Sequence, residues 1–213
     1  MKVNCAMAVL GCLGAALVGA PAAAQQFSAE LVDTGSGNAG HATEVHVSDG
    51  KLRIETPGKH RGFMLTDSKA GTSYIVMPEQ RMYMDMAAMG GSRMIQVLMP
   101  SDPNNACPEW QEAAKSAEHG AEALTSCRRI GGDTVNGRSA VKYEGTTRKG
   151  EHAFAWVDPK LRFMLKTETS SGERMELRNI HEGPQPASLF AIPADFHKVD
   201  MKGMMQRFGK PQG

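Results

Sequence analysis

Residues Gly131–Glu182 read GGDTVNGRSAVKYEGTTRKGEHAFAWVDPKLRFMLKTETSSGERMELRNIHE, and this stretch decides the fold. After a turn rich in Gly and Asn it contains four runs of strand length, separated by Gly, Pro, Asp and Ser: Arg138–Thr147, Glu151–Asp158, Leu161–Thr169 and Glu173–Glu182. Connections of only a few residues force neighbouring strands to run antiparallel. The stretch therefore predicts an antiparallel meander.

Apolar residues alternate with charged ones in each of these runs. Alternation places every second side chain on the same face of a sheet. The apolar positions are Val141, Tyr143, Phe154, Trp156, Leu161, Phe163, Leu165, Met175 and Leu177. We expect them to form one apolar face, which other parts of the chain must cover.

The first half of the chain has the same rhythm and predicts a second meander. Its expected strands are Phe27–Asp33, His41–Val47, Lys51–Thr56, Gly62–Asp67, Thr72–Met77 and Gln80–Met86, with Ser92–Met99 as a further strand. Residues Gly35–Gly40 match the dinucleotide-binding pattern G-x-G-x-x-G. That motif requires a helix to follow, whereas a strand pattern follows here, so we interpret the glycines as a hairpin loop.

Residues 1–24 have the features of a secretory signal peptide. Lys2 precedes the apolar run Ala6–Ala20, and Ala22-Ala23-Ala24 supplies a cleavage site. Without this leader, Lys2 is lost from the 24 basic residues, which leaves 23 basic against 23 acidic residues. Neutrality argues against nucleic acid as a partner. We expect an exported, periplasmic protein.

The mature chain keeps two of the four cysteines, Cys107 and Cys127. In an oxidising compartment such a pair favours a disulfide. Five residues between them recur at helical spacing: Trp110, Ala114, Ala117, Ala121 and Leu124. One unbroken helix would separate the cysteines by about 30 Å, far more than a disulfide allows. We therefore predict a helical insert at about residues 101–129, with a helix of about three turns that ends near Gly120.

These observations predict a signal peptide over residues 1–24 and a single domain over residues 25–200. Residues 201–213 form a separate C-terminal segment. Its apolar residues Met201, Met204, Met205 and Phe208 have the spacing of a short amphipathic helix. Such a helix is too short to be stable alone in water, so we expect it to dock on the domain.

The chain resembles the LolA/LolB-like superfamily of periplasmic lipoprotein carriers, and within it a branch formed by a domain of unknown function. Several short motifs carry the resemblance across most of residues 27–197. They are the hairpin Asp49–Glu55, the strand around Tyr74, Arg81–Met84, Trp156-Val157-Asp158 before Leu161, and the terminal Ser188–Pro193. The Cys107–Cys127 insert and the Met-rich strand depart from the carrier pattern.

The resemblance implies a mainly β fold, with a curved, unclosed antiparallel sheet (a half-barrel) and a helical lid around a hydrophobic cavity. It implies a carrier for a hydrophobic small molecule, a lipid or a lipoprotein acyl chain, with partner proteins in the inner or outer membrane. The expected walls are Leu52, Ile54, Phe63, Leu65, Met82, Met84, Met86, Val141, Tyr143, Phe154, Trp156, Phe163, Leu165, Met175 and Leu177.

Methionine supports a second interpretation. Residues Arg81–Met99 hold six of the 15 methionines, and Met82, Met84 and Met86 share one face of an expected strand. Thioethers in line favour Cu(I), although flexible methionines also suit a wall for varied apolar ligands. The alternatives to a lipid carrier are therefore a periplasmic Cu(I)-binding protein and a non-catalytic structural or accessory protein.

No catalytic constellation is recognisable in the sequence. No serine stands in a G-x-S-x-G motif, and the seven histidines show no H-E-x-x-H or other close metal spacing. We therefore predict a protein that is not an enzyme and uses no cofactor.

Overall fold

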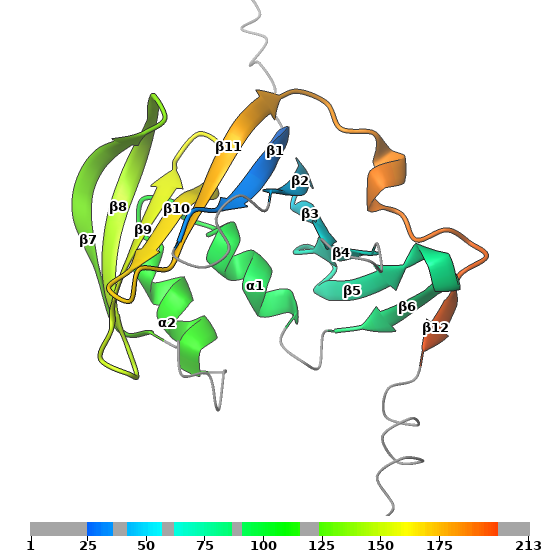
Figure 1. Cartoon of the computed structure of the whole chain (residues 1–213), viewed down its shortest axis with the longest axis horizontal. Coiled ribbons are helices and arrows are strands. Elements are labelled where there is room, and N and C mark those ends of the chain that lie inside the picture. The colour runs from blue at the N-terminus through cyan, green and yellow to red at the C-terminus, as the bar shows by residue number, and fades with distance from the viewer. Residues whose placement is uncertain (1–24, 36–41, 57–61, 87–90, 116–123, 200–213) are drawn as a thin grey trace, which may run out of the picture.

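The structure is a computed structural model that describes residues 25–35, 42–56, 62–86, 91–115 and 124–199. The predicted signal peptide, the C-terminal segment 201–213 and most of the Gly-rich loop lie outside the described residues. Figure 1 shows one large sheet that arches over two helices.

Twelve strands form this single unclosed sheet. They are β1 (Gln26–Asp33), β2 (Ala42–Ser48), β3 (Lys51–Thr56), β4 (Gly62–Asp67), β5 (Thr72–Met77), β6 (Met82–Asp85), β7 (Leu124–Val135), β8 (Arg138–Thr147), β9 (His152–Asp158), β10 (Phe163–Thr169), β11 (Arg174–Glu182) and β12 (His197–Val199). Their order is β12-β6-β5-β4-β3-β2-β1-β11-β10-β9-β8-β7. The prediction of a mainly β, curved and unclosed sheet is confirmed. The sheet is mixed, however, because β12 runs parallel to β6.

Each half of the sheet is a meander, and pairing of β1 with β11 joins the halves. Two of the connections within the described residues are tight hairpin turns. In the Asp49-Gly50 turn the φ angles are 51° and 85°. In the Asn136-Gly137 turn they are 49° and 76°, so both turns have positive φ at both positions. This geometry matches the twist of paired strands, and it favours Asn or Asp followed by Gly.

Helices α1 (Gly91–Leu98) and α2 (Cys107–Lys115) lie under the concave face of the arch (Figure 1). The prediction that Ser92–Met99 is a strand is wrong. Ile95 and Leu98 are buried while Met94 is 40% exposed, which is the three-residue spacing of one helical face. A short apolar run is compatible both with the two-residue period of a strand and with the 3.6-residue period of a helix. Here packing against the sheet selects the helix.

The insert is shorter than predicted. Helix α2 is described as far as Lys115, and its predicted end near Gly120 lies outside the described residues. Strand β7 already begins at Leu124, which pairs with Thr147 instead of continuing a helix. Strand β7 lies at the edge of the sheet and most of its residues are exposed. Because such an edge strand has no regular apolar alternation, its sequence does not indicate a strand.

The prediction that the apolar residues of β8 and β9 share one face is wrong. Tyr143 pairs with Ala155, whereas Trp156 pairs with Lys142 and Phe154 with Glu144. Paired residues point to the same side of a sheet. Phe154 and Trp156 therefore lie on the convex face, opposite to Tyr143. There the Lys142 and Lys166 ammonium groups lie 4.7 and 4.6 Å from the Trp156 ring centre, and their apolar stems shield the ring from water.

Two clusters of buried residues hold the fold together. Most of the main core fills the concave side, where Phe27 packs edge-to-face on Phe163 at 5.3 Å. The second cluster lies on the convex face of β4 and β5, where Phe63 and Leu65 pack with Phe190. Phe190 belongs to the short 3-10 helix η3 (Ala187–Phe190), in the segment between β11 and β12. This segment covers one convex region, so that both faces of the sheet carry apolar residues.

Candidate functional site

A cavity of about 440 Å³ lies between the two helices and strands β7–β10. The helices contribute Arg93, Met94, Val97, Trp110, Ala113 and Ala114. The sheet contributes Leu124, Cys127, Tyr143, Gly145, Thr147, Ala153, Ala155, Met164, Thr167 and Thr169. Glu144, Glu151, Phe154, Glu168 and Glu173 also contact it.

The cavity exists because small residues occupy the concave face at this end of the sheet. Gly145, Ala153 and Ala155 stand where the neighbouring core has large side chains such as Phe27. Small side chains on these neighbouring strands do not reach the helices, so the space between the layers stays open. Directly over Gly145 the space is taken by Leu124, whose side chain would lie 2.6 Å from a Cβ there, so glycine at this position lets Leu124 pack against β8.

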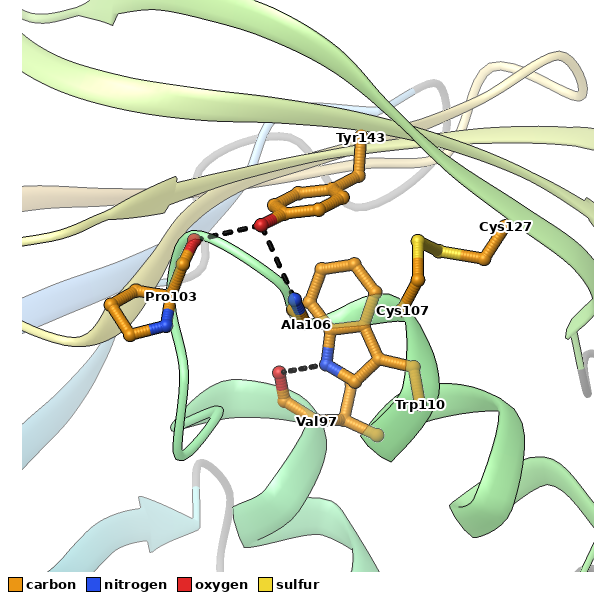
Figure 2. The surroundings of a disulfide bond; sticks show 7 residues. All are labelled: Val97, Pro103, Ala106, Cys107, Trp110, Cys127 and Tyr143. Atoms are coloured by element: carbon orange, nitrogen blue, oxygen red, sulfur yellow. Dashed lines mark hydrogen bonds between the residues drawn. A yellow bond between two sulfur atoms is a disulfide. The ribbon is translucent and has the colours of Figure 1, made fainter.

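A disulfide fixes the position of the cavity wall. Cys107 at the start of α2 is bonded to Cys127 in β7, with 5.4 Å between their Cα atoms, which confirms the predicted pair. Figure 2 shows that Trp110, one turn along α2, packs against Tyr143 of β8. The two ring centres are 5.0 Å apart in an edge-to-face arrangement. Helix α2 is thus held on the sheet at two neighbouring points.

Polar contacts of the two aromatic rings complete this attachment (Figure 2). The Tyr143 hydroxyl donates to the carbonyl of Pro103 at 2.8 Å and accepts from the amide of Ala106 at 3.3 Å. Trp110 Nε1 donates to the carbonyl of Val97 at 3.2 Å, which ties α2 to α1. Burial raises the pKa of Tyr143, so this hydroxyl keeps its proton and its role as donor.

Two of the charged residues at the cavity direct their side chains away from it, because Glu144 and Glu168 are both cross-strand partners of Phe154 and so lie on the convex face. Glu144 pairs with Arg128 and with His152. Glu168 pairs with Lys166 at 3.1 Å and with Arg174 at 2.9 Å, and the hydrogen bond from Lys166 is the main reason that its pKa is lowered. Apart from Arg93, the wall on the concave side consists mainly of apolar, threonine and glycine residues, which favours an uncharged group inside.

A second cavity, of about 550 Å³, differs in chemistry. It lies near the Asp49-Gly50 turn, and many of the groups around it are polar or charged, including Asp67, Lys160 and Arg162. Of the two, the cavity under the helices is the one suited to an apolar ligand.

The structure brings few of the fifteen predicted wall residues to the cavity. Tyr143 contacts it, and so does Phe154, although the ring of Phe154 lies on the opposite, convex face. The main core contains Leu52, Val141, Trp156, Phe163, Leu165 and Leu177, with Ile54 packed against it. Phe63 and Leu65 belong to the convex cluster, and Met175 is 41% exposed. Met82 and Met84 lie in β6, and Met86 follows it, near the other end of the sheet.

The residues that do form the wall were missed because they are small. The sequence signal is nevertheless present. Ala153 and Ala155 alternate with Phe154 and Trp156, and Gly145 stands two residues after Tyr143. Such small residues at alternate positions in a strand can mark an internal space, whereas large residues fill a core.

Within the described part of the chain, no three side chains of His, Cys, Asp or Glu gather closely enough to hold a metal ion. Nor does any helix there have the length and apolar character needed to cross a membrane.

No protein-family model and no curated protein sequence matches the chain. Several solved structures are similar to it. An uncharacterized conserved protein from Thermus thermophilus is 11% identical, with a TM-score of 0.48 over 84% of this chain and 91% of that chain. MucB of Pseudomonas aeruginosa, solved with MucA, is 17% identical, with a TM-score of 0.42 over 82% of this chain and 58% of that chain.

The Mycobacterium tuberculosis lipoprotein LppX is 11% identical, with a TM-score of 0.38 over 76% of this chain and 90% of that chain. Because every one of these TM-scores is below 0.5, the similarities assign no function to this chain. Of the resemblance inferred from the sequence, the structure confirms the architecture, an open curved sheet with helices on its concave face.

Proposed function

We propose that this protein binds one hydrophobic ligand, a lipid or another molecule with an acyl chain, in the cavity under α1 and α2. The observation that supports this most directly is a space of about 440 Å³ with small and apolar walls. That volume falls within the range of about 300–1,000 Å³ usual for small-molecule sites. In this proposal the protein acts as an exported carrier in the periplasm, with residues 1–24 as its signal peptide.

The energetics suit a reversible carrier. Each methylene that leaves water gains roughly 0.8 kcal/mol, so ten methylenes gain roughly 8 kcal/mol before the cost of association. A polar headgroup would stay near Arg93, whose charged side chain contacts the cavity. A ligand held in this way could be both loaded and released.

Filling the cavity tests the proposal. Ala155→Phe places a large ring into the space between sheet and helices. We expect it to weaken the binding of a fluorescent fatty acid, cis-parinaric acid, by about tenfold or more, because the ring occupies the volume of several methylenes. Ala194→Phe, at an exposed position, is the matched control and should bind as the natural protein does.

Native mass spectrometry of the mature protein, before and after organic extraction, gives the ligand class directly. A lipid mass that extraction removes supports the proposal. Equal fatty-acid affinity in the natural protein and Ala155→Phe, with both correctly folded, would reject this cavity as the site. The mass of the exported chain also tests cleavage after Ala24.

A further inference from the structure

The pairing of β5, β6 and β12 places two thioethers and an imidazole in one row. Met77 of β5 pairs with Met82 of β6, and Met82 pairs with His197 of β12. Met77 and Met82 are partly buried, and His197 is exposed. Strand β12 was not predicted, so only the folded chain brings His197 beside the methionines.

The three side chains lie on the same face of the sheet, because cross-strand partners point to the same side. The neighbouring residues show which of the two faces this is. Lys198, next to His197, donates to Asp85 at 2.9 Å. Asp85 pairs with Tyr74, whose ring packs on Tyr83 of the second cluster on the convex face. Lys198 is therefore convex, and its neighbour His197 is concave together with Met82.

We propose that Met77, Met82 and His197 form a binding site for a soft monovalent metal ion, Cu(I) in the periplasm. Thioether sulfur and imidazole nitrogen are ligands that suit copper, and thioethers favour the monovalent ion. Paired side chains start about 5 Å apart, and the outer two strands are roughly 10 Å apart. Long, flexible methionines and a histidine can reach a shared ion across that distance.

Met84 adds a further soft group to the site. It follows Met82 on the same face and pairs with Ile75 and Val199. The proposal thus differs from the sequence interpretation, which placed copper on Met82, Met84 and Met86 of one strand. In the folded chain Met77 and His197, from the two neighbouring strands, lie beside Met82.

The proposed metal site lies apart from the ligand cavity. The cavity is formed with β7–β10, whereas β5, β6 and β12 lie at the opposite end of the strand order. The proposal is therefore independent of the carrier function, and each can be tested without the other. The alternative role of Met77 and Met82 is an apolar wall, which leucine would serve equally well.

Competition for Cu(I) tests the site. The mature chain is titrated without oxygen, with Cu(I) kept reduced by ascorbate, against the chromophoric chelator bicinchoninate. We expect Met82→Leu and His197→Gln each to weaken Cu(I) binding by about tenfold or more, since loss of even a supporting residue typically costs 10–100-fold. Met175→Leu and His181→Gln, both in β11, make the same changes elsewhere and should leave the affinity for Cu(I) unchanged.

The triple variant Met77→Leu, Met82→Leu, His197→Gln decides the matter. It keeps every other methionine, so undiminished Cu(I) binding by this folded variant would overturn the proposal. Absence of binding by the natural protein would overturn it as well. X-ray absorption of the Cu(I)-loaded natural protein provides a second measurement: a copper shell of sulfur with one nitrogen supports the site, and a shell without nitrogen rejects His197 as a ligand.

Discussion

Tyr143 shows how one side chain positions a site. Its ring packs on Trp110 and forms part of the cavity wall, while its hydroxyl holds the backbone at Pro103 and Ala106. Those two residues lie in the connection that leads into α2. A single buried phenol therefore determines where the helix begins relative to the sheet.

Removing that hydroxyl should cost stability. Tyr143→Phe leaves the Pro103 carbonyl and the Ala106 amide without this partner in a buried place. We expect the free energy of unfolding to fall by about 1–2 kcal/mol, measured by urea denaturation. Tyr74→Phe, in the second cluster, serves as the control. An unchanged free energy for Tyr143→Phe would mean that other groups or water replace both hydrogen bonds.

At the scale of elements, helix α2 is attached to the sheet by a covalent bond as well as by packing. The disulfide connects the start of α2 with β7, across a sequence separation of 20 residues. It holds one wall of the cavity against another, because both Cys127 and residues of α2 line the space.

Loss of the bond should therefore affect stability and binding together. We expect the double variant Cys107→Ser, Cys127→Ser to lose about 3 kcal/mol of unfolding free energy, the value typical of a loop of this size. Fatty-acid binding should weaken too, because α2 is no longer held. The natural protein under a reducing agent provides the matched comparison. A stability that does not respond to reduction would contradict this role.

At the scale of the whole molecule, ion pairs connect strands that are distant in sequence. Arg138 at the start of β8 pairs with the buried Asp158 at the end of β9 and with Glu182 of β11. Lys160 also pairs with Glu182, at 2.7 Å. The hydrogen bonds from Lys160 and Arg138 lower the pKa of Glu182. This group links three strands at one end of the second meander.

These pairs predict acid sensitivity. The ordinary pKa of a glutamate is about 4.5, and that of Glu182 is lower in the folded protein. Its contribution to stability is thus complete above about pH 4.5 and is lost as the pH falls through the folded pKa. We expect Glu182→Gln to be less stable than the natural protein near neutral pH, and the difference to shrink below about pH 4.5. Urea denaturation across this range measures it. A difference that stays constant with pH would contradict the prediction.

Local patterns were sufficient to predict most strands, because alternation and turn chemistry act between near neighbours. The boundaries of β8 and β11 were predicted to within a residue, and the disulfide followed from the cysteine pair. Helix α1 was missed because a run of only eight residues is compatible with the period of a strand as well as with that of a helix. Strand β7 was missed because an exposed edge strand needs no alternation.

The sequence by itself determined ten of the twelve strands and the two meanders, since each of these depends on contacts between residues close along the chain. Only the tertiary structure decided the pairing of β1 with β11, the face on which Phe154 and Trp156 lie, and the place of His197 beside Met82. It also decided where the sheet is hollow. Small residues alternate locally in β8 and β9, as Gly145 and Ala155 show, but the space beside them is enclosed by α1 and α2, which only the folded chain brings there.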